Sequence, residues 1–405
     1  MKQDTCQKQP FFSLIPFLIS IGFASFLNQL ARTTFPSMTP YICKEMDLCH
    51  SEIGNLFFIL SIGFAIALFL SQFLSSKISH RKTVTLSIFL TGLAITLTSY
   101  TEDFQLFRCA LLAVGFFAGF LTPSLIAMMR ETIPYEHMGK AFGLYASAQS
   151  IAFILGPTLV QFFIHTFTWR QILNGMGLFS SLSSLLLFSL FKKGGIKGER
   201  ITFFFIKSIF SQPSFWILMG LLCIANGLNI GIYNMAPDYF QKDNLISHEK
   251  THQLIVLARA LTIFTALFGG ILADRFGLKG SIAYCFIACG LLTMLIGAAP
   301  LQISLVLFTF QSPIAGCLMA LTHLAISTIV PPEKNAALTS LIAPFGFLIG
   351  AGGVPQLLGL FGDLNLYSQG FLFFGLTALL SGILFNIHPI YRHIQVSQMK
   401  QTPEV

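Results

Sequence analysis

The chain has 405 residues, of which 54% are hydrophobic and 10% are charged, whereas a soluble domain carries roughly 25% charged residues. This composition excludes a water-soluble fold and predicts an integral membrane protein. The net charge of +8 does not indicate nucleic acid, because nucleic-acid-binding proteins gather Lys and Arg on one solvated face and here they lie between apolar runs. We therefore expect a lipid bilayer, and no nucleic acid, as a partner.

The apolar runs predict about twelve transmembrane helices, because a bilayer core about 30 Å thick needs roughly 20 apolar residues per helix. Lipid offers no hydrogen-bond partner to the backbone, and runs of this length are not the alternating strands of a barrel. We therefore expect an all-α integral membrane protein. In chain order, the expected spans are 11–36, 53–76, 83–100, 105–129, 138–165 and 170–191, then 214–236, 253–274, 280–298, 301–329, 336–361 and 366–388.

The spans divide into two six-helix bundles, at residues 1–191 and 214–388, with a cytoplasmic linker at 192–213 and a cytoplasmic tail at 389–405. The linker alternates basic and apolar residues, so it is either a solvated connection or an amphipathic segment on an anionic leaflet. Most basic residues fall in the loops of one side, which predicts that this side, with both termini, is cytoplasmic. We expect a multi-pass protein of a bacterial inner membrane. The basic residues of the opposite loops are Lys44, Arg170, Lys242 and Lys250.

An internal repeat relates the two bundles. Pro157 in the fifth span and Pro355 in the eleventh lie 198 positions apart, and the loops that begin at Ser76 and Asp274 have the same offset. Transporters built from two homologous halves place the substrate site at the interface near the bilayer midplane, and rocking of the halves gives alternating access. The repeat therefore predicts this arrangement.

Motifs for catalysis and cofactor binding do not occur in the sequence. We find no nucleotide-binding loop, Ser/His/Asp set or Cys/His metal spacing, so we expect no enzymatic activity, no cofactor and no metal site. Cys43 and Cys49 follow the first expected span, and whether they form a disulfide stays open.

Three arginines fall within expected spans, where a charge costs at least about 2.5 kcal/mol on insertion scales and so indicates function. They are Arg32 in the first span, Arg108 at the start of the fourth and Arg259 in the outer part of the eighth. A guanidinium binds carboxylate or phosphate with a bidentate fork, so Arg32 with Arg108 or Arg259 predicts an anion-binding site. For Arg108 and Arg259 the alternative is a snorkelling anchor at the membrane surface.

Uncharged polar residues complete the candidate substrate site. Asn226, Asn229 and Tyr233 share one face of the seventh span, which is either a cavity wall or hydrogen-bonding glue between helices. No carboxylate falls deep in an expected span, because Asp238 is assigned to an outer loop. His323 is therefore the candidate for proton coupling, with a neutral structural histidine as the alternative. The remaining candidates are Asn28 and Gln29 in the first span and Gln311 in the tenth.

The loop at 270–279, GILADRFGLK, closely resembles the conserved loop between the second and third helices of a half in the major facilitator superfamily. The resemblance implies a conformational latch, with a plain cytosolic turn as the alternative. The first-half copy keeps Arg81 and Lys82 but has Ser76 and Ser79 where the family has Asp and Gly, and Gly156 and Pro157 resemble the family's fifth-helix motif. The residues that carry the latch motif are Gly270, Asp274, Arg275, Gly277 and Lys279.

Residues 32–54 are similar to the first helix and loop of the anion:cation symporter branch, whose arginine in the first helix contacts an anionic substrate. The resemblance implies secondary transport of a small organic or inorganic anion. The alternatives are an amino-acid transporter, proton-driven drug efflux or a non-transporting receptor or scaffold with the same fold. We expect a small-molecule substrate, a proton or counter-anion as the coupled ion, and a monomer.

Overall fold

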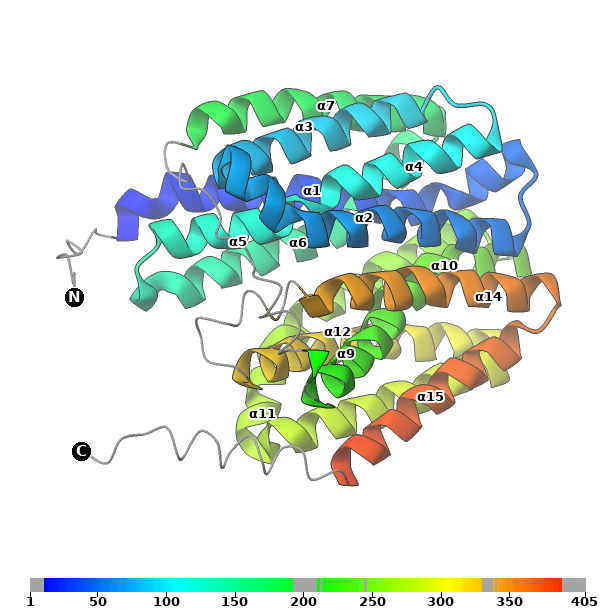
Figure 1. The fold of residues 1–405 in the computed structure, drawn as a ribbon. Helices are drawn as coiled ribbons and strands as arrows, with labels where there is room; N and C mark the ends of the chain where they lie inside the picture. Colours follow the sequence, from blue (N-terminus) through cyan, green and yellow to red (C-terminus); the bar gives the residue numbers. More distant parts are fainter. Residues whose placement is uncertain are drawn as a thin grey trace, which may run out of the picture.

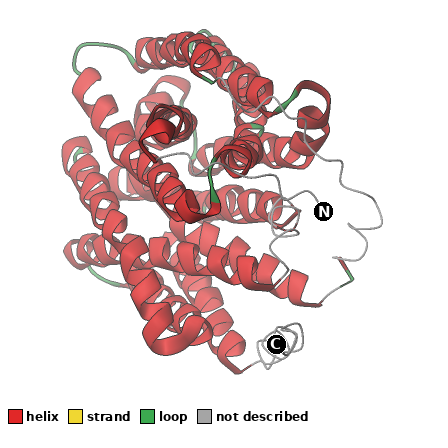
Figure 2. Ribbon diagram, turned by 90° about the vertical axis from the view of Figure 1, so that its left-hand side faces the viewer, coloured by secondary structure: helices red, strands yellow, loops and turns green. Residues whose placement is uncertain are grey.

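The computed structural model describes residues 11–191, 210–211, 213–243, 246–329, 338 and 341–387, and the regular structure within them is helical (Figure 2). The helices of the first half lie together in the upper part of Figure 1 and those of the second half in the lower part. The predicted linker at 192–213, apart from 210–211 and 213, and the tail at 389–405 lie outside the described residues.

The first half contains seven helical segments before the linker. They are α1 (Phe11–Met46), α2 (His50–Ile78), α3 (His80–Thr98), α4 (Phe104–Gly119), α5 (Leu121–Thr132), α6 (Tyr135–Phe163) and α7 (Trp169–Leu190).

In the second half, π-helical segments interrupt two of the helical runs. The elements are α9 (Pro213–Asn226), η1 (Gly227–Gly231), α10 (Ile232–Asp238), η2 (Tyr239–Asp243), α11 (His248–Ala298), α12 (Leu301–Ile329), η3 (Gly346–Gly353), α14 (Val354–Asp363) and α15 (Tyr367–Ile387).

Ten helices among the described residues are long and apolar enough to cross a membrane. The third and eighth expected spans are helical, as α3 and the first part of α11, but they do not belong to this set of ten. The all-α membrane fold is therefore confirmed, and the count of twelve spans stays a prediction.

Two boundaries differ from expectation. The first helix was expected to end at residue 36, but α1 continues to Met46 through Pro36 and Pro40, which membrane helices tolerate because neighbouring groups satisfy the freed carbonyls. Cys43 therefore lies in a helix rather than a loop, and no disulfide joins Cys43 to Cys49. The fourth expected span is divided at Phe120 into α4 and α5.

The internal repeat reappears in the backbone, at the junctions that follow the second helix of each half. Ser79 has φ 79° and ψ 153° between α2 and α3, and Gly277 has φ 72° and ψ 153° within α11. The two positions are 198 residues apart in the sequence, as expected. This backbone region is favourable essentially only for glycine, so the first half forces a serine into the turn that the second half builds with glycine.

Paired glycines repeat with the same offset at two helix crossings. A Cβ on Gly92 of α3 would lie 2.6 Å from the Gly177 carbonyl of α7. A Cβ on Gly290 of α11 would likewise lie 2.7 Å from the Gly375 carbonyl of α15. The third and sixth helices of each half thus cross at backbone contact, which only residues without a side chain allow.

Candidate functional site

A small cavity of about 40 Å³ lies between the two halves. This volume holds about one water molecule, so the side chains are closed around it. Its polar lining comes chiefly from α1 and α10, and its apolar lining from α2, α6, η1, α10 and η3. The lining residues are Gln29, Arg32, Thr33, Phe57, Leu60, Ser61, Phe64, Phe153, Ile230, Tyr233, Asn234, Phe347 and Ala351.

Arg32 brings a positive charge to this cavity. One of its terminal nitrogens donates to Gln29 Oε1 at 2.5 Å, and its guanidinium lies 4.5 Å from the Phe64 ring centroid and 5.5 Å from that of Phe347. Its Nε is buried without a hydrogen-bond partner. Ion pairs with carboxylates among the described residues involve His50 and Arg170, so no acidic side chain there neutralises Arg32.

Arg259 is a second buried cation close to the cavity, with 2% of its surface exposed. It donates to the side-chain oxygen of Asn229 at 2.9 Å and to the backbone carbonyl of the same residue at 2.6 Å. Its guanidinium lies 4.0 Å from the Tyr233 ring and 4.5 Å from the Phe153 ring. Both rings line the cavity, so Arg259 lies behind its aromatic wall and, like Arg32, lacks a carboxylate among the described residues.

The predicted fifth-helix motif, Gly156 and Pro157 of α6, packs against α1 beside the cavity. A Cβ on Gly156 would lie 2.7 Å from Thr33 Oγ1, and Thr33 Oγ1 donates to the Ala152 carbonyl of α6 at 3.0 Å. Pro157 follows within the same helix. The absence of a side chain at Gly156 thus allows α6 to touch the residue next to Arg32.

Several predicted polar residues hold helices together instead of lining the cavity. Asn28 donates to the Ala118 carbonyl at 2.9 Å, and Gln311 donates to the Leu228 carbonyl at 3.1 Å. Asn226 donates to the Leu222 carbonyl of its own helix, and its side-chain oxygen is buried without a partner. Of the expected face of helix seven, only Tyr233 lines the cavity.

Arg108 and His323 also lie outside the lining. Arg108 donates to Gln105 of its own helix and contacts the Phe104 ring near the start of α4, an arrangement that fits the anchor alternative. His323 is exposed on α12 and its Nδ1 donates to the Met319 carbonyl one turn earlier.

The residues of the predicted latch lie at the start of α3 and within α11. Arg81 donates to the Phe188 carbonyl at 2.6 Å and its guanidinium lies 4.4 Å from the Phe188 ring, which ties α3 to α7. Arg275 contacts the neighbouring Phe276 ring, and Lys82 and Lys279 start α3 and the second part of α11. Gly270 and Asp274 belong to α11, but their side-chain surroundings lie outside the described part of the chain.

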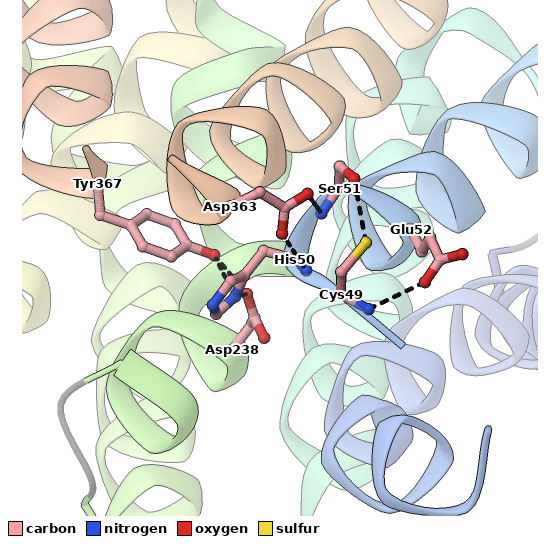
Figure 3. A network of polar contacts seen from close by, with 7 residues as sticks. All are labelled: Cys49, His50, Ser51, Glu52, Asp238, Asp363 and Tyr367. Atoms are coloured by element: carbon pink, nitrogen blue, oxygen red, sulfur yellow. Dashed lines mark hydrogen bonds and ion pairs between the residues drawn. The ribbon is translucent and has the colours of Figure 1, made fainter. Parts of the chain in front are cut away.

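A polar network joins the two halves at one end of the molecule, where α1 connects to α2 and α14 connects to α15 (Figure 3). We call this end the outer end. The sequence did not indicate this network. His50 Nδ1 lies 2.5 Å from Asp238 Oδ2, and the Tyr367 hydroxyl donates to the same oxygen. Asp238 was assigned to a loop, but it is the last residue of α10 and is 4% exposed. The assignment was wrong because the helix runs past Pro237 and packs its end against α2 and α15.

Asp363, at the end of α14, completes this network (Figure 3). Its carboxylate accepts from the backbone N–H groups of His50 at 2.8 Å and Ser51 at 3.1 Å. Free N–H groups at a helix start attract an acceptor and a negative charge, and here the acceptor comes from the other half of the chain. Asn55 also donates to Gln356 at 2.9 Å, so α2 and α14 are hydrogen-bonded together and the outer end is closed.

Comparisons with known proteins agree with this architecture. The family model of the Major Facilitator Superfamily matches residues 21–245, which is more than half of the chain. The chain is 24% identical over 180 residues to an uncharacterized MFS-type transporter, YhcA, of Bacillus subtilis (44% of this chain, 33% of the relative). It is 22% identical over 177 residues to a probable sulfoacetate transporter, SauU, of Cupriavidus necator (44% and 41%).

A probable L-galactonate transporter of Escherichia coli is 20% identical over 174 residues, or 42% of this chain and 38% of the relative. The matches thus span about a third to two fifths of the relatives' length.

Solved structures show the same fold over nearly the whole chain. A bacterial homolog of the human lysosomal transporter Spinster, in an inward-facing and occupied conformation, superposes with a TM-score of 0.75 at 13% identity, covering 97% of this chain and 98% of that one. A D-xylose–proton symporter superposes with a TM-score of 0.72 at 14% identity, covering 93% and 97%. With a family model that matches more than half of its residues, this multi-pass membrane protein belongs to the Major Facilitator Superfamily.

Proposed function

We propose that this protein is a secondary transporter that moves a small anion across the membrane by alternating access. The observation that carries the proposal is the pair Arg32 and Arg259, a half-buried and a buried guanidinium group at the cavity between the halves, with no carboxylate partner among the described residues. A charge held inside a membrane protein without a counter-charge is costly. An anionic solute that enters the cavity would offset this cost.

The lining also weighs against the alternatives. An amino acid or a cationic drug carries a positive charge that needs a carboxylate or another acceptor, and none of the lining residues is acidic. The two arginines would repel such a cation at close range. The names of two relatives, which refer to sulfoacetate and L-galactonate, are in keeping with an anionic solute.

Alternating access is supported by the distribution of contacts between the halves. The network of His50, Asp238, Asp363 and Tyr367 closes the outer end, and these contacts must break for a solute to enter from that end. We further propose that this end faces the extracytoplasmic side of a bacterial inner membrane, with both termini in the cytoplasm, because most basic residues lie in the loops of the opposite side. A proton or a counter-anion remains the candidate coupled ion, and we expect a monomer.

The test is binding and uptake with Arg32→Lys and Arg32→Ala variants. Purified protein is melted in the presence of carboxylates, sulfonates, phosphate, amino acids and cationic drugs, and stabilisation reports binding. Removing one member of a buried charged pair costs about 2–5 kcal/mol, so Arg32→Ala should weaken binding of the active anion at least about 30-fold. Uptake of that anion into proteoliposomes should be lost in parallel.

Arg108→Ala is the matched control, because Arg108 lies outside the cavity and bonds only within its own helix turn. It should leave the affinity for the anion unchanged. If cationic drugs stabilise the protein and anions do not, the proposal fails in favour of efflux. Binding of an anion without uptake under any gradient would indicate a receptor with this fold.

A further inference from the structure

The wall of the cavity is dominated by aromatic side chains. Five rings line it, and they come from both halves of the chain: Phe57 and Phe64 of α2, Phe153 of α6, Tyr233 of α10 and Phe347 of η3. Leu60, Ile230 and Ala351 add further apolar surface. Arg32 is the charged residue of this lining, so the site has one cationic end and a remainder that is mostly aromatic and aliphatic.

Apart from Arg32, some polar groups of the lining are engaged within the protein, and the side chains of Tyr233, Ser61 and Asn234 are the ones available to a solute. Thr33 Oγ1 already contacts the backbone carbonyls of Gln29 and Ala152, and Gln29 Oε1 accepts from Arg32. The hydroxyl of Tyr233 is buried without a partner, and Ser61 and Asn234 add two more polar side chains. A polyhydroxylated acid would need a partner for each hydroxyl group, since a buried hydroxyl without one is costly.

The surroundings of the Arg32 guanidinium restrict the direction from which a solute can bind it. The rings of Phe64 and Phe347 lie against its guanidinium at 4.5 and 5.5 Å, a contact that stabilises a cation over an aromatic face. Its Nε remains without a partner. Because a guanidinium donates within its own plane, this edge still has an N–H group to donate to a carboxylate once the halves separate, while aromatic surface lies against the faces.

The space for the body of the solute lies between the halves. The Phe64 and Phe347 rings, one from each half, touch with their centroids 4.6 Å apart, and Phe153 of the first half meets Tyr233 of the second at 5.8 Å. Rocking of the halves would separate both pairs and leave a slot walled by these four rings. The 40 Å³ cavity is the closed form of that slot.

We propose that the solute is a compact organic monoanion with an apolar body, such as an aromatic or alicyclic monocarboxylate. Its carboxylate binds the edge of Arg32, and its ring lies between the Phe64–Phe347 and Phe153–Tyr233 pairs. The inference rests on the proposed function, because it assigns a chemical class to the solute of the same site. It separates this chain from relatives that are named for sulfoacetate and L-galactonate, both of which are strongly polar anions.

The experiment compares small anions of different polarity on the unaltered protein by thermal stabilisation and competition, and gluconate matches the ring carboxylates in charge. Benzoate and cyclohexanecarboxylate represent the proposed class, and gluconate, sulfoacetate and inorganic phosphate represent the alternatives. We expect the first two to bind at least tenfold more tightly than the other three. Phe347→Ser should weaken benzoate binding more than tenfold, whereas Phe347→Leu, which keeps the apolar volume, should weaken it only a few-fold.

Phe373→Ser is the matched control, because Phe373 is an exposed aromatic residue of α15 and does not line the cavity. Benzoate affinity should not change in this variant. If gluconate, sulfoacetate or phosphate binds more tightly than the two ring carboxylates and depends on Arg32, the inference is overturned while the proposed anion transport stands. If no anion of either class shows binding that depends on Arg32, the proposed function itself fails.

Discussion

Removing the carboxylate of Asp363 should shift the protein away from the outer-closed state. This side chain accepts from the N–H groups of His50 at 2.8 Å and Ser51 at 3.1 Å, and it caps the start of α2 from the opposite half. Replacing a helix N-cap acceptor by Ala costs about 1 kcal/mol, and the loss of a negative charge there adds about 0.3–1 kcal/mol. Because Asp363 is solvent-exposed, solvent screening reduces these values, and we take about 1 kcal/mol for both effects together.

This free energy acts on the conformational equilibrium because both hydrogen bonds join the two halves. They exist in the outer-closed state and must be absent when the halves separate at that end. The ratio of closed to open molecules should therefore fall about fivefold in Asp363→Ala. Asp363→Asn keeps an acceptor oxygen and loses only the charge, so its shift should be about twofold.

The native thiol of Cys49 reports the change, because it lies at the start of α2 with its Sγ 3.2 Å from Ser51 Oγ and is only partly exposed (Figure 3). Labelling of intact cells with a membrane-impermeant maleimide should be faster in Asp363→Ala by about the same fivefold factor, and Cys49→Ser should abolish the difference. Asp103→Ala is the control, because Asp103 caps α4 by accepting from Leu106 at 2.9 Å within one half. Equal labelling of Cys49 in wild type and Asp363→Ala, or equal acceleration by Asp103→Ala, would refute the argument.

Two further predictions concern the backbone. Ser79→Gly should raise the free energy of unfolding in an SDS titration by about 1 kcal/mol. Ser79 holds a conformation that costs about 1–3 kcal/mol for residues other than Gly, and the larger entropy that Gly loses on folding offsets part of this gain. Gly277→Ser should lower the free energy of unfolding, and a lower stability of Ser79→Gly would contradict the assigned turn. Gly156→Ala should cost about 1–3 kcal/mol by overpacking α6 against Thr33 and should weaken anion binding at Arg32. Gly143→Ala in the same helix, where an added Cβ meets nothing within 4 Å, should do neither, and equal effects at both positions would rule out the close contact as the cause.

The sequence alone was sufficient for the features that depend on composition and local pattern. Long apolar runs in a chain with 10% charged residues must form helices in lipid, so the all-α membrane fold could be predicted. The offset of 198 residues between Pro157 and Pro355 predicted the repeat, which the Ser79 and Gly277 turns and the crossing glycines confirm. A charge inside an apolar run is conspicuous for the same reason, so the sequence indicated Arg32, Arg108 and Arg259 alike, and only the structure separated Arg108 from the cavity.

Only the tertiary structure decided which apolar residues line the cavity and which polar residues close the outer end. The chain contains 44 phenylalanines, and a helix that is apolar on all sides gives no periodic signal to separate cavity rings such as Phe64 from lipid-facing rings such as Phe373. His50 and Asp238 are 188 positions apart and Tyr367 lies 129 positions further on, so no local pattern links them. These groups meet because packing of the two halves brings the ends of α2, α10 and α15 together, and that packing depends on contacts along every helix at once.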